Sequence, residues 1–145
     1  MFAFEALTYA DGETAREWLT YEAVKRWICI DDWDAFFAWA SPNPDYYMFR
    51  AIIGNKLLGI IGLEIVGAQG FILMMIDPAQ QNRGYGKLLL KQFLRDARQL
   101  TRDELTVIEA GIFPGNTGSV RCFTACGFLH TGPGKDGEQR YEYIV

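Results

Sequence analysis

The chain has 145 residues, 50% of them hydrophobic and 22% charged, and its formal net charge is −4 at pH 7. This length allows one domain, 1–145, with a sizeable core, and leaves no room for a second. A net negative charge without any Lys/Arg-rich run argues against nucleic acid and against an anionic membrane as the main partner. No stretch approaches the roughly 18 uninterrupted apolar residues of a membrane span, and the N-terminus lacks a signal pattern, so we expect a soluble, cytoplasmic protein.

One strand followed by two helices is predicted for the N-terminal third. Residues 2–8 are apolar and strand-like, and Asp11-Gly12 is expected to close this strand and begin a helix. Apolar residues then recur near helical spacing as far as about Ile30. Asp31 or Asp32 can cap a second helix, which the proline-rich segment 41–44 ends.

The middle of the chain changes to a strand pattern. Residues 46–53 and 57–66 are predicted strands joined by the turn Gly54-Asn55. An apolar run from Phe71 to Ile76 fits a strand that is buried on both faces. Pro78 lacks the N–H that a strand ladder needs, so this strand stops before it. We therefore expect a meander of antiparallel strands.

A long amphipathic helix and a set of shorter elements complete the chain. Apolar residues recur at helical spacing up to Leu100, and basic side chains take the opposite face. The remaining segments fit a strand, a short helix and then two strands: 105–112, 116–126, 128–131 and 139–145. This order indicates an α/β fold of the α+β type, with a mixed, mostly antiparallel twisted sheet of about seven strands and about four helices packed on it.

The turn before the long helix, Gln81-Asn82-Arg83-Gly84-Tyr85-Gly86-Lys87, combines glycines with the start of a helix. The glycines leave no Cβ to obstruct an approaching group, and the free N–H groups and the positive helix end would hold an anion. A Walker A loop would need Gly at position 81 and Ser or Thr at 88, and a dinucleotide fingerprint would need a third Gly at 89. Gln81, Leu88 and Leu89 stand there, so neither motif is present and NAD binding is disfavoured.

The pattern Gln81-x-x-Gly84-x-Gly86 resembles the loop that binds the pyrophosphate of acetyl-CoA in the GNAT superfamily of N-acetyltransferases. A later stretch, Asn116-x-x-Ser119-x-x-x-Phe123-x-x-x-Gly127-Phe128, is similar to that family's second signature, a short helix leading into Gly-Phe. With the elements between them, the resemblance covers most of the chain beyond about Tyr46. It implies an N-acetyltransferase that moves the acetyl group of acetyl-CoA directly to a primary amine of a small molecule or a peptide.

The resemblance also implies where acetyl-CoA lies, between the central strand and the one after it. Backbone groups of Met74, Met75 and Ile76 would bind the pantetheine arm, with an N–H, assigned to Ile76, on the thioester carbonyl. The glycine turn would bind the pyrophosphate, although Arg83 and Lys87 are equally well explained as solvated surface residues. The implied cofactor-binding residues of the two signatures are Gln81, Asn82, Arg83, Gly84, Tyr85, Gly86, Lys87, Asn116, Ser119 and Phe123.

Acetylation of an amine needs a base, because an ammonium of pKa about 10.4 must lose a proton before it attacks. Glu64 and Glu109, on the strands before and after the central one, are the candidates, acting directly or through water. For each, the alternative is an outward-facing residue on a half-buried strand. Phe123 stands where the family usually has the tyrosine that protonates the leaving thiolate, so the alternative function is a CoA or acyl-CoA sensor without turnover.

The two N-terminal helices carry the remaining signals. Their aromatic residues beside carboxylates suit a cationic amine, but aromatic residues at helical spacing usually pack in a core, and acidic residues in a first turn usually serve the helix dipole. These residues are Trp18, Tyr21, Trp27, Trp33, Phe36, Phe37, Trp39, Asp31, Asp32 and Asp34. No metal site is expected, because Cys122, Cys126 and His130 lack an evident fourth ligand. The aromatic content also makes a homodimer plausible.

Overall fold

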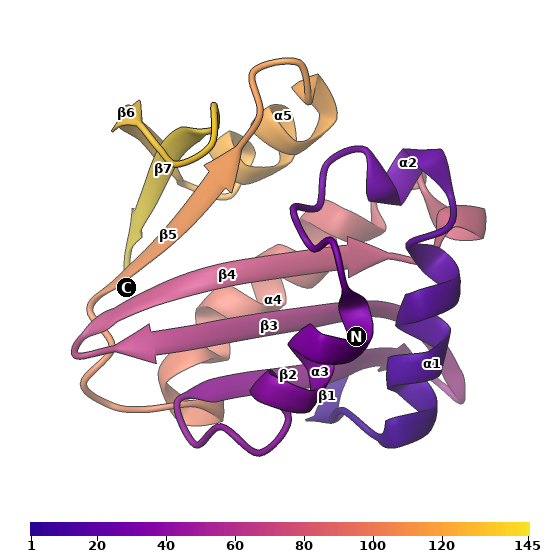
Figure 1. The fold of residues 1–145 in the computed structure, drawn as a ribbon. Coiled ribbons are helices and arrows are strands. Elements are labelled where there is room, and N and C mark those ends of the chain that lie inside the picture. Colours follow the sequence, from indigo (N-terminus) through magenta and orange to yellow (C-terminus); the bar gives the residue numbers. More distant parts are fainter.

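A seven-stranded sheet forms the centre of the computed structural model, which describes residues 1–145 (Figure 1). The strands lie in the order β1-β2-β3-β4-β5-β7-β6, and every neighbouring pair is antiparallel except β4 and β5, which are parallel. Their bounds are β1 Ala3–Ala6, β2 Tyr46–Ile53, β3 Lys56–Val66, β4 Gln69–Ile76, β5 Val107–Ile112, β6 Leu129–Pro133 and β7 Gln139–Ile144. The predicted mixed, mostly antiparallel sheet is confirmed.

Helices cover both faces of this sheet. They are α1 Tyr9–Trp18, α2 Glu22–Lys25, α3 Trp33–Ala40, α4 Tyr85–Leu100 and α5 Thr117–Ala125, with a 3₁₀ turn at Pro78–Gln80. Figure 1 shows α1, α2 and α3 in front of the sheet and α4 behind it. The larger core lies between the sheet and α4 with α5, and a smaller core joins the sheet to α1 and α3. No helix has both the length and the hydrophobicity needed to cross a membrane.

The first helix begins earlier than predicted. α1 starts at Tyr9 because Thr8 caps it: the Asp11 N–H donates to Thr8 Oγ1 at 3.2 Å, and the Thr8 N–H donates to Asp11 Oδ2 at 2.9 Å. Asp11 therefore lies inside the first turn. Its carboxylate is buried and lies 3.1 Å from Arg50 Nε on β2, an ion pair whose alignment falls short of a hydrogen bond.

The same helix also ends earlier than predicted. α1 stops at Trp18, and the Thr20 hydroxyl donates to the Glu17 carbonyl at 2.7 Å in the turn that follows. A separate short helix, α2, comes next, which is why the structure has one helix more than expected. The prediction of one helix from Asp11 to about Ile30 was wrong.

The long helix α4 agrees with its predicted pattern. Leu89, Phe93 and Ala97 are fully buried against the sheet, whereas Lys87 and Lys91 are exposed. The helix crosses close to β3, since a Cβ on Gly59 would lie 2.6 Å from Leu89 Cδ1. This close approach fixes the start of α4, and with it the glycine turn, beside the end of β4.

The parallel strands β4 and β5 pair only at their beginnings. Gln69 pairs with Val107, Gly70 with Ile108 and Phe71 with Glu109. Beyond these pairs the strands diverge, and Figure 1 shows β5 rising away from β4. β4 begins at Gln69 rather than at the predicted Phe71, because Gln69 and Gly70 belong to this parallel pairing. The second half of β4 is therefore left with one edge that has no partner strand.

Candidate active site

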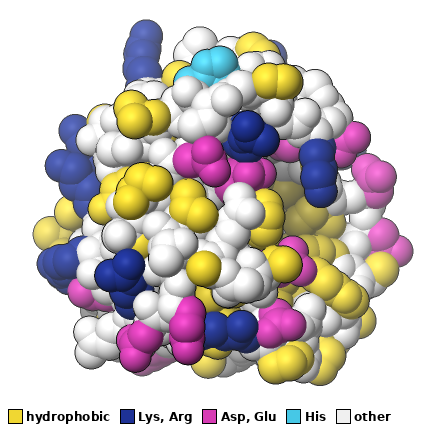
Figure 2. Space-filling model, turned by 90° about the vertical axis from the view of Figure 1, so that its left-hand side faces the viewer, with side chains coloured by type: hydrophobic (Ala, Val, Ile, Leu, Met, Phe, Trp, Pro, Cys, Tyr) yellow, Lys and Arg dark blue, Asp and Glu magenta, His cyan; other side chains and the backbone are white.

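A cavity of about 960 Å³ lies where β4 and β5 diverge. Its walls come from both of these strands, the turn before α4, α5, the β6–β7 turn and the segment around α2. Figure 2 shows a hollow with hydrophobic walls and with acidic and basic side chains gathered near it. Both segments that carry the sequence signatures border this space.

The free edge of β4 presents main-chain groups of Met74 and Ile76 to the cavity. The Asp77 N–H donates to the Leu58 carbonyl of β3 at 2.9 Å, so Asp77 faces β3. In an antiparallel ladder without a register shift this direction alternates, so Met75 also faces β3 while Met74 and Ile76 face away from it. The Met75 side chain lies in the smaller core. The prediction that Met75 offers its backbone to a ligand therefore disagrees with this register.

The turn before α4 presents a run of free amide groups. The N–H groups of Gln81 to Gly84 donate to no backbone carbonyl, and those of Tyr85 to Lys87 belong to the first turn of α4, where a helix offers no acceptor. Gly84 adopts φ of 80°, a left-handed conformation that suits glycine. These free donors at the positive end of a long helix fit a pyrophosphate.

The glycine turn also leaves room for such a ligand. A Cβ on Gly86 would lie 3.8 Å from Cys122 Sγ and 3.9 Å from Met74 Cε, so it would fill the space between β4 and α5. Each predicted residue of the turn lines the cavity except Arg83, whose side chain is exposed.

Helix α5 forms the wall opposite the end of β4. Asn116 caps it by accepting from the Ser119 N–H at 3.2 Å, and both residues line the cavity. Phe123 lines it too, but its ring is only 6% exposed and packs edge-on against Phe128, with centroids 5.0 Å apart. Burial, followed by the neighbouring Cys126, raises the pKa of the Cys122 thiol to about 11. This thiol is therefore protonated at neutral pH.

Strand register aligns a row of side chains on the face covered by α1 to α3. The successive partners across β2, β3, β4, β5 and β7 are Tyr46, Glu64, Phe71, Glu109 and Glu142. Directly paired residues point to the same face, and Ile60, an even number of residues before Glu64 on β3, belongs to the smaller core. Both candidate bases therefore lie on one face, separated by Phe71.

Of the two candidate bases, Glu109 lines the cavity and Glu64 does not. Gln69 Nε2 donates to Glu109 Oε1 at 3.1 Å and so orients this carboxylate. Glu64 lies beside Tyr46, where burial and then the negative charge of Glu64 raise the pKa of the tyrosine. The structure thus brings only Glu109 together with the predicted cofactor residues.

Sequence reasoning did not identify Glu138, which the turn between β6 and β7 brings to the cavity. Its carboxylate lies over the β5 backbone, since a Cβ on Gly111 would be 2.6 Å from Glu138 Oε1. Burial, then the charges of Asp136 and Glu109, raise the pKa of Glu138. Nothing in the local sequence marks a carboxylate in such a turn, because only the fold places it near Glu109.

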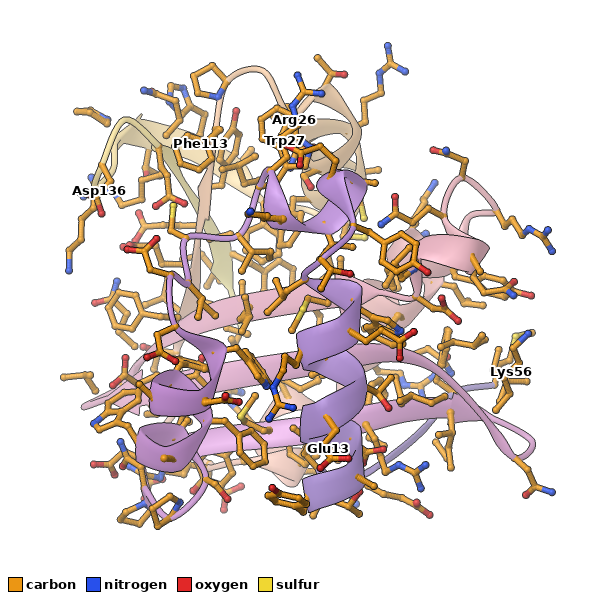
Figure 3. All side chains as sticks on the ribbon, turned by 45° about the vertical axis from the view of Figure 1, so that its right-hand side comes forward. Glu13, Arg26, Trp27, Lys56, Phe113 and Asp136 are labelled. Carbon is orange, nitrogen blue, oxygen red and sulfur yellow. The ribbon has the colours of Figure 1, made fainter.

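The aromatic residues of the N-terminal helices divide between core and cavity. Trp18 and Trp33 are each only 6% exposed and belong to the smaller core. Trp27 lines the cavity instead, and Figure 3 shows it against Phe113 at the end of β5, with ring centroids 6.4 Å apart. The Arg26 guanidinium lies 4.6 Å from the centre of the Trp27 ring. The core-packing interpretation therefore holds for Trp18 and Trp33, and a role of the aromatic residues in binding an amine stays a prediction.

The carboxylates and the cysteine of the same segment have distinct surroundings. Asp32 caps α3 by accepting from the Ala35 N–H at 3.0 Å, and Asp34 forms an exposed ion pair with Arg16 at 2.6 Å. These two carboxylates therefore serve the helices. Cys29 is exposed and lines the cavity.

The model of the acetyltransferase (GNAT) family matches residues 12–128, so the chain belongs to the GNAT acetyltransferases. The uncharacterised N-acetyltransferase YfmK of Bacillus subtilis (strain 168) is 24% identical over 145 residues, with 92% of this chain and 90% of YfmK covered. This confirms the family that the sequence motifs indicated.

Solved structures of acetyltransferases share the fold. Aminoglycoside acetyltransferase AAC(6')-Ib in complex with coenzyme A has a TM-score of 0.82 at 16% identity, covering 99% of this chain and 95% of that chain. Spermidine N-acetyltransferase from Vibrio cholerae in complex with CoA and spermine has a TM-score of 0.79 at 15% identity, with the same shares of 99% and 95%. At these identities the similarity establishes the fold.

Proposed function

We propose that the chain transfers the acetyl group of acetyl-CoA to a primary amine. The observation that carries this proposal is the divergence of β5 from β4, which leaves the Met74 and Ile76 amides free beside the amides of turn 81–87. One cavity therefore offers an edge for an extended arm and a group of donors for a pyrophosphate. Membership of the family supports acetyl transfer, and the CoA in the structures of the two similar acetyltransferases supports the ligand.

Acetyl-CoA supplies an acetyl group activated as a thioester. The amides of turn 81–87 bind its pyrophosphate, and the main chain of Met74 and Ile76 pairs with its pantetheine arm in place of the missing strand. An N–H of Met74 or Ile76 directed at the thioester carbonyl stabilises the negative charge that develops on its oxygen. Such a preorganised donor is commonly worth about 2.7–4 kcal/mol.

We assign Glu109 as the general base that takes the proton from the amine. Its carboxylate lines the cavity, is oriented by Gln69, and can accept the proton directly or through a water molecule. Glu64 is the weaker candidate, because it lies outside the lining. The neutral amine then attacks the thioester carbon, the C–S bond breaks and CoA leaves as its thiolate, with no covalent intermediate on the protein.

A CoA or acyl-CoA sensor is the second candidate function. It is favoured by one observation, namely that Phe123 brings no hydroxyl to the wall formed by α5. A sensor would bind acetyl-CoA without releasing CoA in the presence of any amine.

The test is CoA release from acetyl-CoA across polyamines, amino acids, aminoglycosides, arylalkylamines and short peptides, with product masses and a parallel acetyl-CoA thermal shift. An acetylated product establishes the enzyme. Binding without turnover across the panel favours the sensor, and absence of binding contradicts both functions.

With an active amine in hand, the two candidate bases can be separated. We expect Glu109→Gln to lower kcat by about 10²-fold or more, as loss of a general base does. Glu64→Gln is the matched control, because it removes a carboxylate from the same row outside the cavity, and it should leave kcat nearly unchanged. Equal losses in the two variants would contradict the assignment to Glu109.

A further inference from the structure

The part of the cavity that faces α1 to α3 has walls of two kinds. One wall is hydrophobic and is formed by Ile28, Ile30, Phe36, Tyr46, Phe71 and Leu73. The other is acidic, with Glu109 on β5 and Glu138 just before β7. The acidic groups thus lie together at one side, and the opposite side offers rings and aliphatic chains.

Glu138 stands at the level where acetyl transfer would occur. Phe71 on β4 pairs with Glu109 on β5. Two residues further along each strand, Leu73 and Gly111 therefore lie at the same height, although the strands have begun to diverge there. The Glu138 carboxylate lies directly over Gly111. Its position along the strands is therefore next to that of Met74, whose free amide faces the cavity.

No basic side chain of the protein neutralises Glu138. It takes part in none of the ion pairs of the structure. Of the basic residues that line the cavity near it, Arg140 donates from Nε to Thr131 Oγ1 at 3.1 Å, and Lys135 is exposed in the turn. Asp136 and Glu109 are the charges that act on it, and both repel a negative carboxylate. A bound ammonium would relieve this repulsion.

We propose that the acceptor is an amine with a single cationic group on a hydrophobic, preferably aromatic, body, and that Glu138 holds its ammonium. This inference rests on the proposed function and names its substrate class. The body lies against the hydrophobic wall formed by Phe36, Tyr46 and Phe71. A second ammonium, as in a polyamine, would be placed against that wall and would lose hydration without gaining a partner.

Two other carboxylates do not alter this expectation. Glu22 lines the cavity but is exposed at the start of α2, and Glu64 lies outside the lining, beside Tyr46. Neither is therefore available to a second ammonium that lies along the hydrophobic wall.

The test compares 2-phenylethylamine with 1,5-diaminopentane as acceptors at saturating acetyl-CoA. The two amines have similar lengths, but one has a ring where the other has a second ammonium. We expect kcat/KM to favour 2-phenylethylamine by about tenfold or more, because the hydrophobic wall accepts a ring and does not compensate a charge.

Two variants isolate the role of Glu138. Glu138→Gln keeps the size of the side chain and removes its charge, and it should raise the KM for 2-phenylethylamine by about tenfold or more. Glu22→Gln is the matched control, because it removes the charge of an exposed carboxylate that borders the same cavity from α2 and does not act on Glu138. We expect its KM to stay within about twofold of the wild-type value.

Preference for the diamine, or equal KM values in the two variants, would overturn the inference and leave the proposed function intact. If neither amine is acetylated, calorimetric titration of 2-phenylethylamine into the CoA-saturated protein tests whether the acceptor site exists. Binding that Glu138→Gln weakens supports the acceptor site, whereas no binding overturns it. If acetyl-CoA itself does not bind, the proposed function fails first, and this inference fails with it.

Discussion

At position 123 the absence of a hydroxyl bears on the proposed acetyl transfer, because a hydroxyl there could protonate the leaving thiolate. Phe123 borders the cavity from α5 and brings no hydroxyl to it, whereas Ser119 and Tyr85, which carry hydroxyls, line the same cavity. A thiol of pKa about 8.5 can leave without being protonated, so the reaction does not depend on an acid. We expect Phe123→Tyr to raise kcat about tenfold, because a general acid typically contributes at least that much.

The measurement is kcat at saturating acetyl-CoA and acceptor. Phe113→Tyr is the control, since it adds a hydroxyl to the same cavity at the end of β5, against Trp27, and should give no gain. An unchanged kcat in Phe123→Tyr together with a lower Tm would mean that the new hydroxyl is buried against Phe128.

Glu138 connects the chemistry of the cavity with the pH dependence of stability. Burial, Asp136 and then Glu109 raise its pKa in the folded protein above the ordinary glutamate value of about 4.3. The folded state therefore binds this proton more tightly than the unfolded state, and the free energy of unfolding falls as pH rises through the window between the two pKa values. A variant without this carboxylate should therefore not show this fall in the free energy of unfolding as pH rises.

We expect Glu138→Gln to be more stable than the wild type at pH 7 and to lose this advantage below about pH 4, where the wild-type carboxyl is protonated in both states. Urea denaturation at the two pH values measures the difference. Glu104→Gln removes an exposed carboxylate far from the cavity lining and should show no such change. Equal stability of Glu138→Gln and wild type at pH 7 would show that the carboxylate is not repelled in the folded protein.

At the scale of elements, patterns contained in one segment could be predicted and pairings between distant segments could not. The amphipathic helix α4 and the glycine turn are local, so the sequence alone identified them. The start of α1 was missed because Asp11-Gly12 is a turn signal, whereas the capping by Thr8 depends on how the preceding strand ends. The choice between Glu64 and Glu109 and the presence of Glu138 in the site follow from register across the sheet, which no local pattern contains.

The start of α4 offers a test of the proposed pyrophosphate site at this scale. A side chain larger than hydrogen at position 86 would enter the space bordered by Met74, Ile76 and Cys122. A Cβ there would meet its neighbours only at 3.8 Å or more. Gly86→Val should therefore disturb the fold less than it disturbs ligand binding.

We expect Gly86→Val to weaken acetyl-CoA binding by about tenfold or more, because the valine occupies the space through which the pyrophosphate reaches the amides. Isothermal titration calorimetry measures the affinity. Gln99→Val places the same side chain at the exposed end of the same helix and should bind like the wild type. Wild-type affinity in Gly86→Val would place the pyrophosphate elsewhere.

At the scale of the whole molecule, the cavity separates two parts of the sheet. Strands β1 to β4 and strands β5 to β7 meet in the sheet only through the residue pairs from Gln69–Val107 to Phe71–Glu109. Across the gap, α4 contacts α5, and Trp27 contacts Phe113. A ligand bound between β4 and α5 would add contacts with both parts and so stabilise the fold as a whole.

Binding of acetyl-CoA to the folded state alone, at about 100 times its Kd, adds about 2.7 kcal/mol to the free energy of unfolding. For a chain of this length that corresponds to a rise in Tm of about 5–10 °C. S-acetylpantetheine at the same concentration lacks the pyrophosphate, so we expect it to raise Tm by less than about 2 °C in calorimetric scans. If the fragment stabilises the protein as much as acetyl-CoA does, the free amides of turn 81–87 contribute nothing to binding, and the ligand is held by the edge of β4 alone.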